Sequence, residues 1–252
     1  VNILAITTFN VNGDLPTASG GDLLSVSGTN ANFSPSADDA GSILVDAQTI
    51  AIASTEQVFF DGETGNGTLT LTTPSEADSI ILLPGSTIDS GKLQAASLLG
   101  LNFGNLGATG SVSLADVGGT RVDSLTVAGT TGDDIWTLAA TDGAITLNSQ
   151  LAIATPGVAT VTLADTGGND TFNVNATQPY TAITLSGGQG SDTASLTGTA
   201  ASDTIGVSLA DGTVTGVGGP VSLSSVESLS VDGNGGVDTV NLDGAGESSV
   251  LA

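Results

Sequence analysis

The side chains of this chain that could do chemistry are nearly all aspartates. The 252 residues include 21 Asp and five Glu, against Lys92 and Arg121 as the two basic residues, and there is no His or Cys. Carboxylate oxygens bind hard cations such as Ca²⁺ or Mg²⁺, whereas the imidazole and thiolate ligands of softer metals are missing. The same absence excludes a Cys or Ser nucleophile paired with His. The candidate chemistry is therefore cation binding, with turn formation by Asp as the competing explanation.

The net charge narrows the range of partners. A formal charge of −24 at pH 7 opposes binding to phosphate groups, which Lys and Arg drive. Apolar runs such as Ile80 to Leu83 are far shorter than the ~18 residues that a membrane-spanning helix needs. We therefore expect no nucleic-acid partner and no membrane insertion.

The composition predicts a β-structure. Hydrophobic residues make up 39% of the chain, which is enough to bury a core, but aromatic residues make up only 3%. With 36 glycines in the chain, the core has to consist of short Val-, Ile-, Leu- and Ala-rich strands separated by tight turns.

A short unit, Asp-x-apolar-x-apolar-x-Gly-Thr, recurs along the chain. Close copies begin at Asp22, Asp123 and Asp192, and looser copies begin at Asp78, Asp170 and Asp238. From Asp78 onward the spacings are 45, 47, 22 and 46 residues, which are one or two multiples of about 23. A period of that length, with short strands and Asp/Gly corners, is typical of one coil of a parallel β-helix.

We predict an all-β fold, namely a right-handed parallel β-helix or solenoid with about 23 residues per rung. Tandem β-sandwich domains are the alternative, because turn signals every 8–12 residues or so also fit them. Residues 1–21 are expected to form an N-terminal strand, a cap or an assembly segment, and residues 22–252 the solenoid. Because the last unit lacks a polar cap, we expect the solenoid to continue into further chain or a neighbouring subunit.

One corner of this solenoid is the leading candidate for a metal site. In the rung model Asp170 and Asp192 lie on adjacent rungs, about 5 Å apart. Two carboxylates at that distance repel by about 3 kcal/mol at an effective dielectric constant of 20, and a bound cation would reverse the sign. Asp165, Asn169 and the carbonyl oxygen of Gly188 are near enough in sequence to complete an oxygen shell for Ca²⁺.

The remaining candidate ligands are aspartates that we assign to the other corners. They are Asp203, Asp232, Asp238, Asp116 and Asp123. For these, the spacing predicts alternate rungs about 10 Å apart, too far for one ion to bridge. Other aspartates precede glycine and are predicted to be ordinary turn formers, namely those of Asp61-Gly62, Asp142-Gly143 and Asp211-Gly212.

The sequence also resembles known repeat proteins. The segment G-G-Q-G-S-D-T-A-S from Gly187 fits the nonapeptide G-G-x-G-x-D-x-U-x, and shorter versions end at Asp170 and Asp238. It resembles the calcium-binding repeats of RTX (haemolysin-type) proteins, which repeat the motif continuously, whereas the complete motif occurs once here. The G-G-x-D-T units, with V-E-S-L-S-V-D-G between them, resemble arrays of bacterial adhesins and surface-layer proteins. The resemblance implies Ca²⁺ binding by Asp carboxylates and Gly carbonyls, and a secreted, cell-surface location.

These observations predict an extracellular structural or adhesive repeat protein, stabilised by Ca²⁺ and self-assembling as a homo-oligomer or polymer into a surface layer or filament. Extracellular polysaccharide is a second expected partner. The alternative is a polysaccharide-binding or polysaccharide-active β-helix protein. Lyases and epimerases need a base and neutralising Lys or Arg, but Lys92, Arg121 and Tyr180 are widely spaced. A hydrolase with two carboxylates is compatible with the composition, but we expect no enzyme activity.

Overall fold

The computed structural model describes residues 8–13, 21–63, 65–119 and 121–244. These residues form 24 strands joined by turns, without a helix. The strands belong to two long, mostly parallel sheets, which we call sheet A and sheet B. The all-β prediction is confirmed, and the arrangement is consistent with a β-solenoid. Mostly parallel pairing is unlike the antiparallel sheets of a β-sandwich. No helix that could cross a membrane occurs in the described ranges.

The chain forms two compact units. The N-terminal unit is Val1–Leu125 with Ser149–Val158, and the C-terminal unit is Thr126–Asn148 with Ala159–Ala252. Each unit contains strands of both sheets, and the chain passes from the first unit to the second within β12 (Asp123–Ala128).

In the N-terminal unit, the sheet A strands lie in the order β1-β5-β4-β3-β7-β11-β15, and the sheet B strands in the order β2-β6-β10-β9-β8. The strands are β1 (Thr8–Asn12), β2 (Leu23–Ser27), β3 (Asn30–Pro35), β4 (Gly41–Val45), β5 (Gln48–Ala53), β6 (Gln57–Asp61), β7 (Thr68–Thr73), β8 (Ser79–Pro84), β9 (Gly91–Ala95), β10 (Leu101–Gly104), β11 (Ser111–Asp116) and β15 (Ile153–Ala154). Of the predicted N-terminal segment 1–21, β1 pairs in parallel with β5, whereas residues 1–7 and 14–20 lie outside the described ranges.

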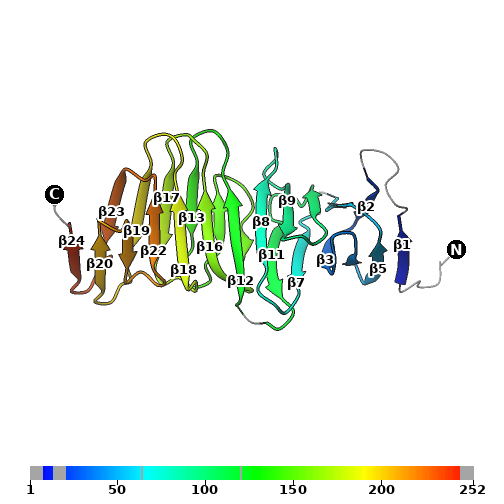
Figure 1. The fold of residues 1–252 in the computed structure, drawn as a ribbon, viewed down its shortest axis with the longest axis horizontal. Helices are drawn as coiled ribbons and strands as arrows, with labels where there is room; N and C mark the ends of the chain where they lie inside the picture. Colours follow the sequence, from blue (N-terminus) through cyan, green and yellow to red (C-terminus); the bar gives the residue numbers. More distant parts are fainter. Residues whose placement is uncertain (1–7, 14–20, 64, 120, 245–252) are drawn as a thin grey trace. The chain divides into compact units, whose positions relative to one another are not determined.

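In the C-terminal unit, sheet A runs β14-β13-β17-β19-β23 and sheet B runs β16-β18-β22-β21-β20-β24. The strands are β13 (Ile135–Leu138), β14 (Ile145–Leu147), β16 (Val158–Ala164), β17 (Thr171–Asn175), β18 (Ala182–Ser186), β19 (Thr193–Thr197), β20 (Thr204–Ser208), β21 (Thr213–Thr215), β22 (Val221–Ser224), β23 (Ser228–Asp232) and β24 (Thr239–Asp243). Figure 1 shows β13, β17 and β19 side by side in this unit.

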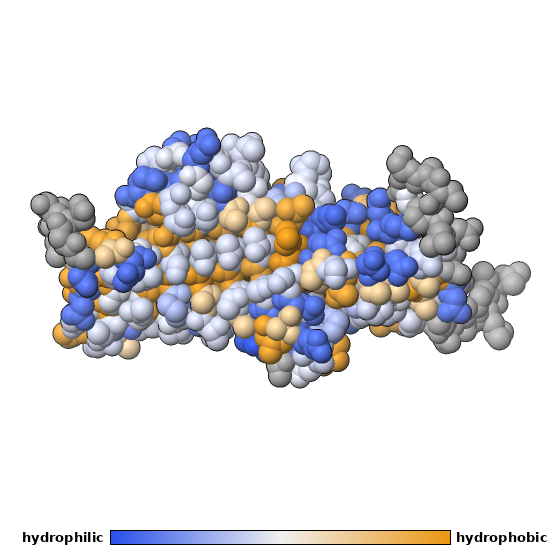
Figure 2. All heavy atoms as spheres, in the orientation of Figure 1, coloured by the Kyte–Doolittle hydropathy of each residue, from blue (hydrophilic) through white to orange (hydrophobic). Residues whose placement is uncertain are grey.

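Alternating apolar residues build the core of the C-terminal unit. In β17, β18 and β19 every second side chain is buried between the sheets, as period-two strands require. Trp136 and Phe172 stack there with ring centroids 6.2 Å apart, and Tyr180 is also buried. On the face of this unit seen in Figure 2, pale polar and orange apolar side chains lie in rows that cross the strands. Like side chains therefore stack from rung to rung.

The coil length is not constant. Between β17 and β19 the chain advances 22 residues per rung, as predicted. Elsewhere it inserts antiparallel three-stranded meanders, such as β20-β21-β22 in the C-terminal unit and β3-β4-β5 in the N-terminal unit. Corresponding residues of neighbouring rungs are then 35 to 45 positions apart. The prediction of about 23 residues in every rung is therefore wrong, and a spacing of 45 is one step rather than two.

The chain crosses between the two sheets at two kinds of corner. In the C-terminal unit, the corners that enter sheet A end at Asp134, Asp170, Asp192 and Glu227, each directly before its strand. The corners that enter sheet B end at Thr181 before β18, at Asp203 before β20 and at Asp238 before β24. The aspartates therefore occupy two corners of this unit, whereas a uniform period would have placed them at one.

Candidate metal centre

Four acidic side chains stack along the sheet A corner of the C-terminal unit. The backbone N–H of Asp134 donates to Asp170 Oδ1, that of Asp170 to Asp192 Oδ1, and that of Asp192 to Glu227 Oε2, each at 2.8 Å. We call these four residues the acid ladder. Because their strands are neighbours in sheet A, the acids follow one another at about 4.8 Å. The prediction that Asp170 and Asp192 share a corner on adjacent rungs is confirmed.

A glycine precedes this corner where the ladder acid needs room. Gly187 lies five residues before Asp192, and a Cβ at Gly187 would collide with Asp192 Oδ2. By the register of β16 and β18, the counterpart of Gly187 on the neighbouring rung is Asp165, five residues before Asp170. Asp165 therefore adds a fifth carboxylate where the next rung has no side chain.

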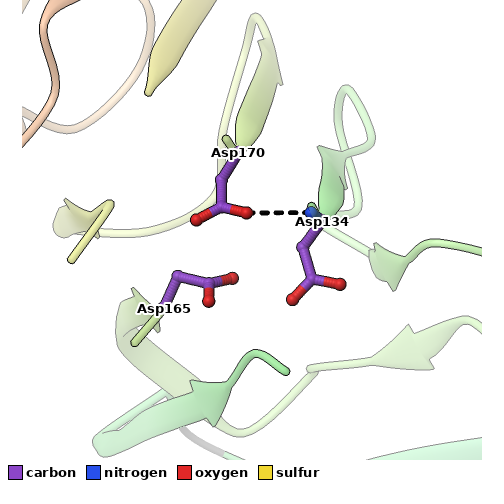
Figure 3. Close-up of side chains that lie close together, drawn as sticks. All are labelled: Asp134, Asp165 and Asp170. Carbon is purple, nitrogen blue, oxygen red and sulfur yellow. Dashed lines mark hydrogen bonds between the residues drawn. The ribbon is translucent and has the colours of Figure 1, made fainter. Parts of the chain in front are cut away.

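Asp165 completes a cluster of three buried carboxylates with Asp134 and Asp170. One oxygen from each side chain lies within 4.8 Å of the other two. Figure 3 shows the carboxyl group of Asp165 directed toward the other two side chains. The exposed fractions of Asp134, Asp165 and Asp170 are 1%, 6% and 1%. Gly129 makes room for the cluster, because a Cβ there would collide with Asp165 Oδ2.

The hydrogen bonds of the cluster hold its carboxylates in place. Asp134 accepts the Thr130 N–H at 2.6 Å and a hydrogen bond from the Asn148 amide. Asp165 accepts the N–H of Thr166 at 2.8 Å and Trp136 Nε1–H at 3.2 Å. Asp170 Oδ2 is buried without a hydrogen-bond partner in the described part of the chain. A buried carboxylate oxygen without a donor is the group that a cation would satisfy.

No basic side chain of the protein can neutralise this cluster from within its own unit, because Lys92 and Arg121 both belong to the N-terminal unit. Arg121 is also engaged there, with Nη1 donating to the carbonyls of Thr155 and Val158 at 3.0 and 3.1 Å. Each pair of ionised carboxylates in the cluster repels by about 3 kcal/mol at an effective dielectric constant of 20. Protons or an added cation would remove that repulsion.

Without a bound cation, burial and the neighbouring carboxylates make protonation of the cluster easier. Burial, then the hydrogen bond with Asp134, raise the pKa of Asp165 to about 6, although donation from Thr166 acts in the opposite direction. Burial also raises the pKa of Asp170, which the Asp134 N–H lowers and the negative charge of Asp192 raises further. A single proton shared within the cluster therefore competes with a metal ion for the same oxygens.

Without added metal, this cluster is expected to make the protein less stable as the pH rises through the range from 3.8 to about 6. The folded state binds more protons than the unfolded state in that range, so the free energy of unfolding falls with pH. Asp165→Asn keeps the side-chain shape but cannot ionise. Urea unfolding in EDTA at several pH values should therefore show wild type losing stability relative to Asp165→Asn. A constant difference between the two proteins across the range would contradict the shifted pKa.

The structure does not bring Asn169 into the cluster. Its side chain is exposed, its Oδ1 accepts the Ser191 N–H at 3.0 Å, and its own N–H donates to Asp133 Oδ1 at 2.7 Å. Gly188 lies against the cluster corner with φ of +82°, and a Cβ there would lie 2.8 Å from the Asp165 carbonyl oxygen. Only glycine fits this close approach. Its carbonyl as a ligand stays a prediction.

Asp203 and Asp238 occupy the sheet B corner on adjacent rungs. The Asp203 N–H donates to Asp238 Oδ1 at 3.0 Å, so the expected separation of about 10 Å on alternate rungs is wrong. Asp203 Oδ2 also accepts the Thr199 N–H at 2.7 Å. Asp232 is exposed and accepts the Asn234 N–H at 2.9 Å, as a turn aspartate does.

Asp116 and Asp123 are buried in the N-terminal unit. Asp123 accepts the Asp78 N–H at 2.9 Å and the Thr73 hydroxyl at 2.6 Å, which repeats the ladder contact of the other unit. Asp116 accepts the Gly118 N–H at 2.9 Å within its own turn. Burial raises the pKa of Asp123, and burial followed by the charge of Asp123 raises that of Asp78. As ligands, Asp116 and Asp123 stay predictions.

The predicted turn formers behave as expected. Asp61 accepts the N–H of Glu63 at 2.9 Å, and Asp142 accepts the N–H of Ala144 at 3.1 Å. Asp211 accepts the Ser208 hydroxyl at 2.9 Å. These contacts close local turns. The aspartates of the chain therefore fall into three groups: those that form turns, those that accept an N–H from a neighbouring rung, and those of the buried cluster.

Asp134 is the cluster residue that the sequence analysis missed. The signal that could have found it is a step of five residues from a corner glycine to a ladder acid. That step occurs as Gly129-Asp134, Gly187-Asp192, Gly198-Asp203 and Gly233-Asp238. Two ladder acids depart from it, because Ser222 precedes Glu227 and Asp165 precedes Asp170 at this step, and the three-carboxylate cluster forms where the first position is aspartate.

The geometry thus defines a buried, oxygen-only site suited to a hard cation. The part of the chain with the RTX-like motif, Gly187 to Asp192, lies on the rung beside Asp170. Its Asp192 supplies a ladder contact there. Compared with known proteins, the chain matches no protein-family model, no curated protein and no solved structure.

Proposed function

We propose that the protein is an extracellular structural repeat protein, of the surface-layer or adhesive kind, that binds Ca²⁺ at Asp134, Asp165 and Asp170. The observation behind this proposal is the convergence of three buried carboxylates in a unit that contains no Lys, Arg or His. A divalent cation offsets the mutual repulsion and gives the unpartnered Asp170 Oδ2 a positive neighbour.

Burial favours Ca²⁺ over Mg²⁺ as the ion. Mg²⁺ releases its water molecules reluctantly and usually keeps several of them, whereas Ca²⁺ accepts six to eight oxygen ligands in irregular geometry, backbone carbonyls included. The three carboxylates are at most 6% exposed and lie within glycine-rich corners, which favours protein oxygens over hydration water. A protein outside a cell is also expected to meet Ca²⁺ at millimolar concentration.

The ladder contacts support a structural role. Three of the four ladder carboxylates, those of Asp170, Asp192 and Glu227, accept an N–H from the preceding rung, so these contacts exist only in a stack of rungs. Like side chains in rows stabilise the same stack (Figure 2). A stack that can be extended suits assembly with further copies, and its Ser- and Thr-rich strands suit contact with extracellular polysaccharide.

The same cluster gives no support to polysaccharide hydrolysis. A glycosidase needs two carboxylates on either side of a sugar ring. Asp134, Asp165 and Asp170 are buried beneath the corner, where a sugar cannot reach them. The raised pKa values of Asp165 and Asp170 follow from burial and from neighbouring carboxyl groups, which a structural cation site also produces.

Calcium is expected to raise the melting temperature of the protein relative to EDTA at pH 7. If the dissociation constant is about 0.5 mM, as in extracellular modules, then 5 mM Ca²⁺ stabilises the folded state by about 1.4 kcal/mol. For a protein of this size that corresponds to a shift of about 3–6 °C. Circular dichroism melting curves measure it.

Magnesium and sodium at matched ionic strength are the controls, because both screen surface charge and neither suits the buried site as well as Ca²⁺. They should give a clearly smaller shift. Equal melting temperatures in Ca²⁺ and EDTA would sink the proposed cation site.

A further inference from the structure

Two strands of sheet B have a hydrogen-bonded neighbour on one side only among the described strands. β2 pairs with β6, and β24 pairs with β20. Edge strands offer unpaired N–H and C=O groups to other chains, and proteins usually protect such edges with Lys or Pro. The sequences of β2 (L-L-S-V-S) and β24 (T-V-N-L-D) contain neither residue.

Both edges also leave inward-facing apolar side chains incompletely covered. Val240 and Leu242 of β24 lie beside Ile205 and Val207 of β20. The β20 residues are 0% and 6% exposed, whereas Val240 is 46% exposed. At the other edge, Leu24 and Val26 lie beside the fully buried Val58 and Phe60 of β6 and are themselves half-buried. One more rung on each edge would bury these side chains as in the interior.

The acid contacts give the two edges matching halves of one ladder. At the corners that enter sheet B, the N–H of the acid before one strand donates to the acid of the next rung: Asp203 to Asp238 at 3.0 Å, and Asp22 to Glu56 at 2.6 Å. Asp238 directly precedes β24, as Asp22 directly precedes β2. To continue this pattern, the Asp238 N–H needs a carboxylate acceptor on the next rung, directly before its strand. Asp22 holds that position before β2.

We propose that β24 of one copy of this chain pairs in parallel with β2 of a second copy. Placing Thr239 beside the second copy's Leu23 brings Val240 next to its Leu24 and Leu242 next to its Val26. The same register sets the Asp238 N–H opposite the second copy's Asp22. The apolar pattern and the ladder thus select one register independently. This contact joins two different surfaces, so each added copy again offers a free edge strand and the copies join head to tail.

The proposal rests on the structural role proposed above but does not depend on the cation site. The contact can be blocked selectively, because alternate residues of a parallel strand bond to opposite neighbours. The Thr239 N–H donates to the backbone carbonyl of Asp203, the residue directly before β20, so the N–H of Val240 faces the open edge. Gln57 donates to the carbonyl of Asp22, so the N–H of Leu23 faces the open edge as well. Proline at either position removes an edge donor and leaves the pairing within the chain intact.

The test is sedimentation velocity and electron microscopy of the 252-residue chain across a dilution series. Wild type should form open-ended polymers, and Val240→Pro and Leu23→Pro should each be monomeric. An equimolar mixture of the two variants should form a one-to-one dimer, because Leu23→Pro keeps an intact β24 and Val240→Pro an intact β2. Val240→Thr and Leu23→Thr, which keep the N–H, are the matched controls and should polymerise.

Several outcomes would overturn the proposal. These are wild type that stays monomeric throughout, a proline variant that dimerises with itself, and a mixture that stays monomeric. Val240→Lys and Leu23→Lys repeat the mixing test with charge instead of proline, in case a proline variant does not fold. A monomeric wild type that still melts higher in Ca²⁺ than in EDTA would refute this interface and leave the cation site standing.

Discussion

Asp165→Gly is expected to abolish the calcium response of the protein and to leave its fold intact. Glycine is the residue that the neighbouring rung carries at this position, so the corner accommodates it. The variant removes one of the three carboxylates that converge with Asp134 and Asp170. The difference in melting temperature between Ca²⁺ and EDTA, about 3–6 °C in wild type, should fall to nearly zero.

In EDTA at pH 7 the same variant should be more stable than wild type. Removing Asp165 ends two repulsive contacts of about 3 kcal/mol each at an effective dielectric constant of 20, and a glycine costs about 1 kcal/mol of chain entropy. The sign distinguishes a cation site from a structural hydrogen bond. If Asp165 mainly anchored the Trp136 indole, its loss would destabilise the protein with and without calcium.

Trp136 gives a direct measurement of this prediction. It is the only Trp of the chain, it is fully buried, and its indole N–H donates to Asp165. Its fluorescence should therefore change as Ca²⁺ fills the site in wild type and stay constant in Asp165→Gly. Asp232→Gly removes an exposed turn carboxylate and is the matched control, for which the full calcium response is expected. A wild-type response in Asp165→Gly would rule out the cluster as the calcium site.

The fold class could be predicted from the sequence because period-two strands and Asp/Gly corners are local signals. The coil length could not be predicted, because the two strands that a meander adds to a rung have the same alternating pattern in the sequence as the strands of a new rung. The 45 residues from Asp78 to Asp123 match two coils of about 23 numerically, but they span one step that includes the meander β8-β9-β10. Only hydrogen-bonded pairing distinguishes these two arrangements.

The candidate site was predicted in part for the same reason. Asp165, Asp170 and Asp192 come from the one region where the coil is 22 residues long, so the rung model was correct there. Asp134 reaches the cluster across a step of 36 residues that passes through β14, and no constant period could place it. Asp203 and Asp238 were assigned too large a separation because the meander β20-β21-β22 lies between them.

Asp123→Ala is expected to destabilise the N-terminal unit by about 2–4 kcal/mol, the largest loss of stability that we predict for a single substitution. The Asp123 side chain is fully buried and accepts both the Asp78 N–H and the Thr73 hydroxyl. Truncation leaves the Asp78 N–H without its acceptor and forces the Thr73 hydroxyl onto the Ala115 carbonyl alone. A buried donor without a partner costs about 1–3 kcal/mol, and the cavity adds to that loss. Urea unfolding followed by circular dichroism measures it.

Asp123→Asn separates the ladder role from the predicted ligand role of this residue. Its amide oxygen can accept the Asp78 N–H, and its amide nitrogen can donate to Thr73 Oγ1 while the hydroxyl donates to Ala115. Because burial raises the pKa of Asp123, removal of the charge carries no penalty in the folded state, and stability close to that of wild type is expected. If Asp123 instead bound calcium, the loss of its negative charge in Asn would reduce the calcium-dependent shift. If the calcium-dependent shift in melting temperature is unchanged in Asp123→Asn, Asp123 stabilises the fold through its hydrogen bonds and not through a bound metal. Calcium binding would then be confined to the corner where Asp165 occupies the position of a glycine.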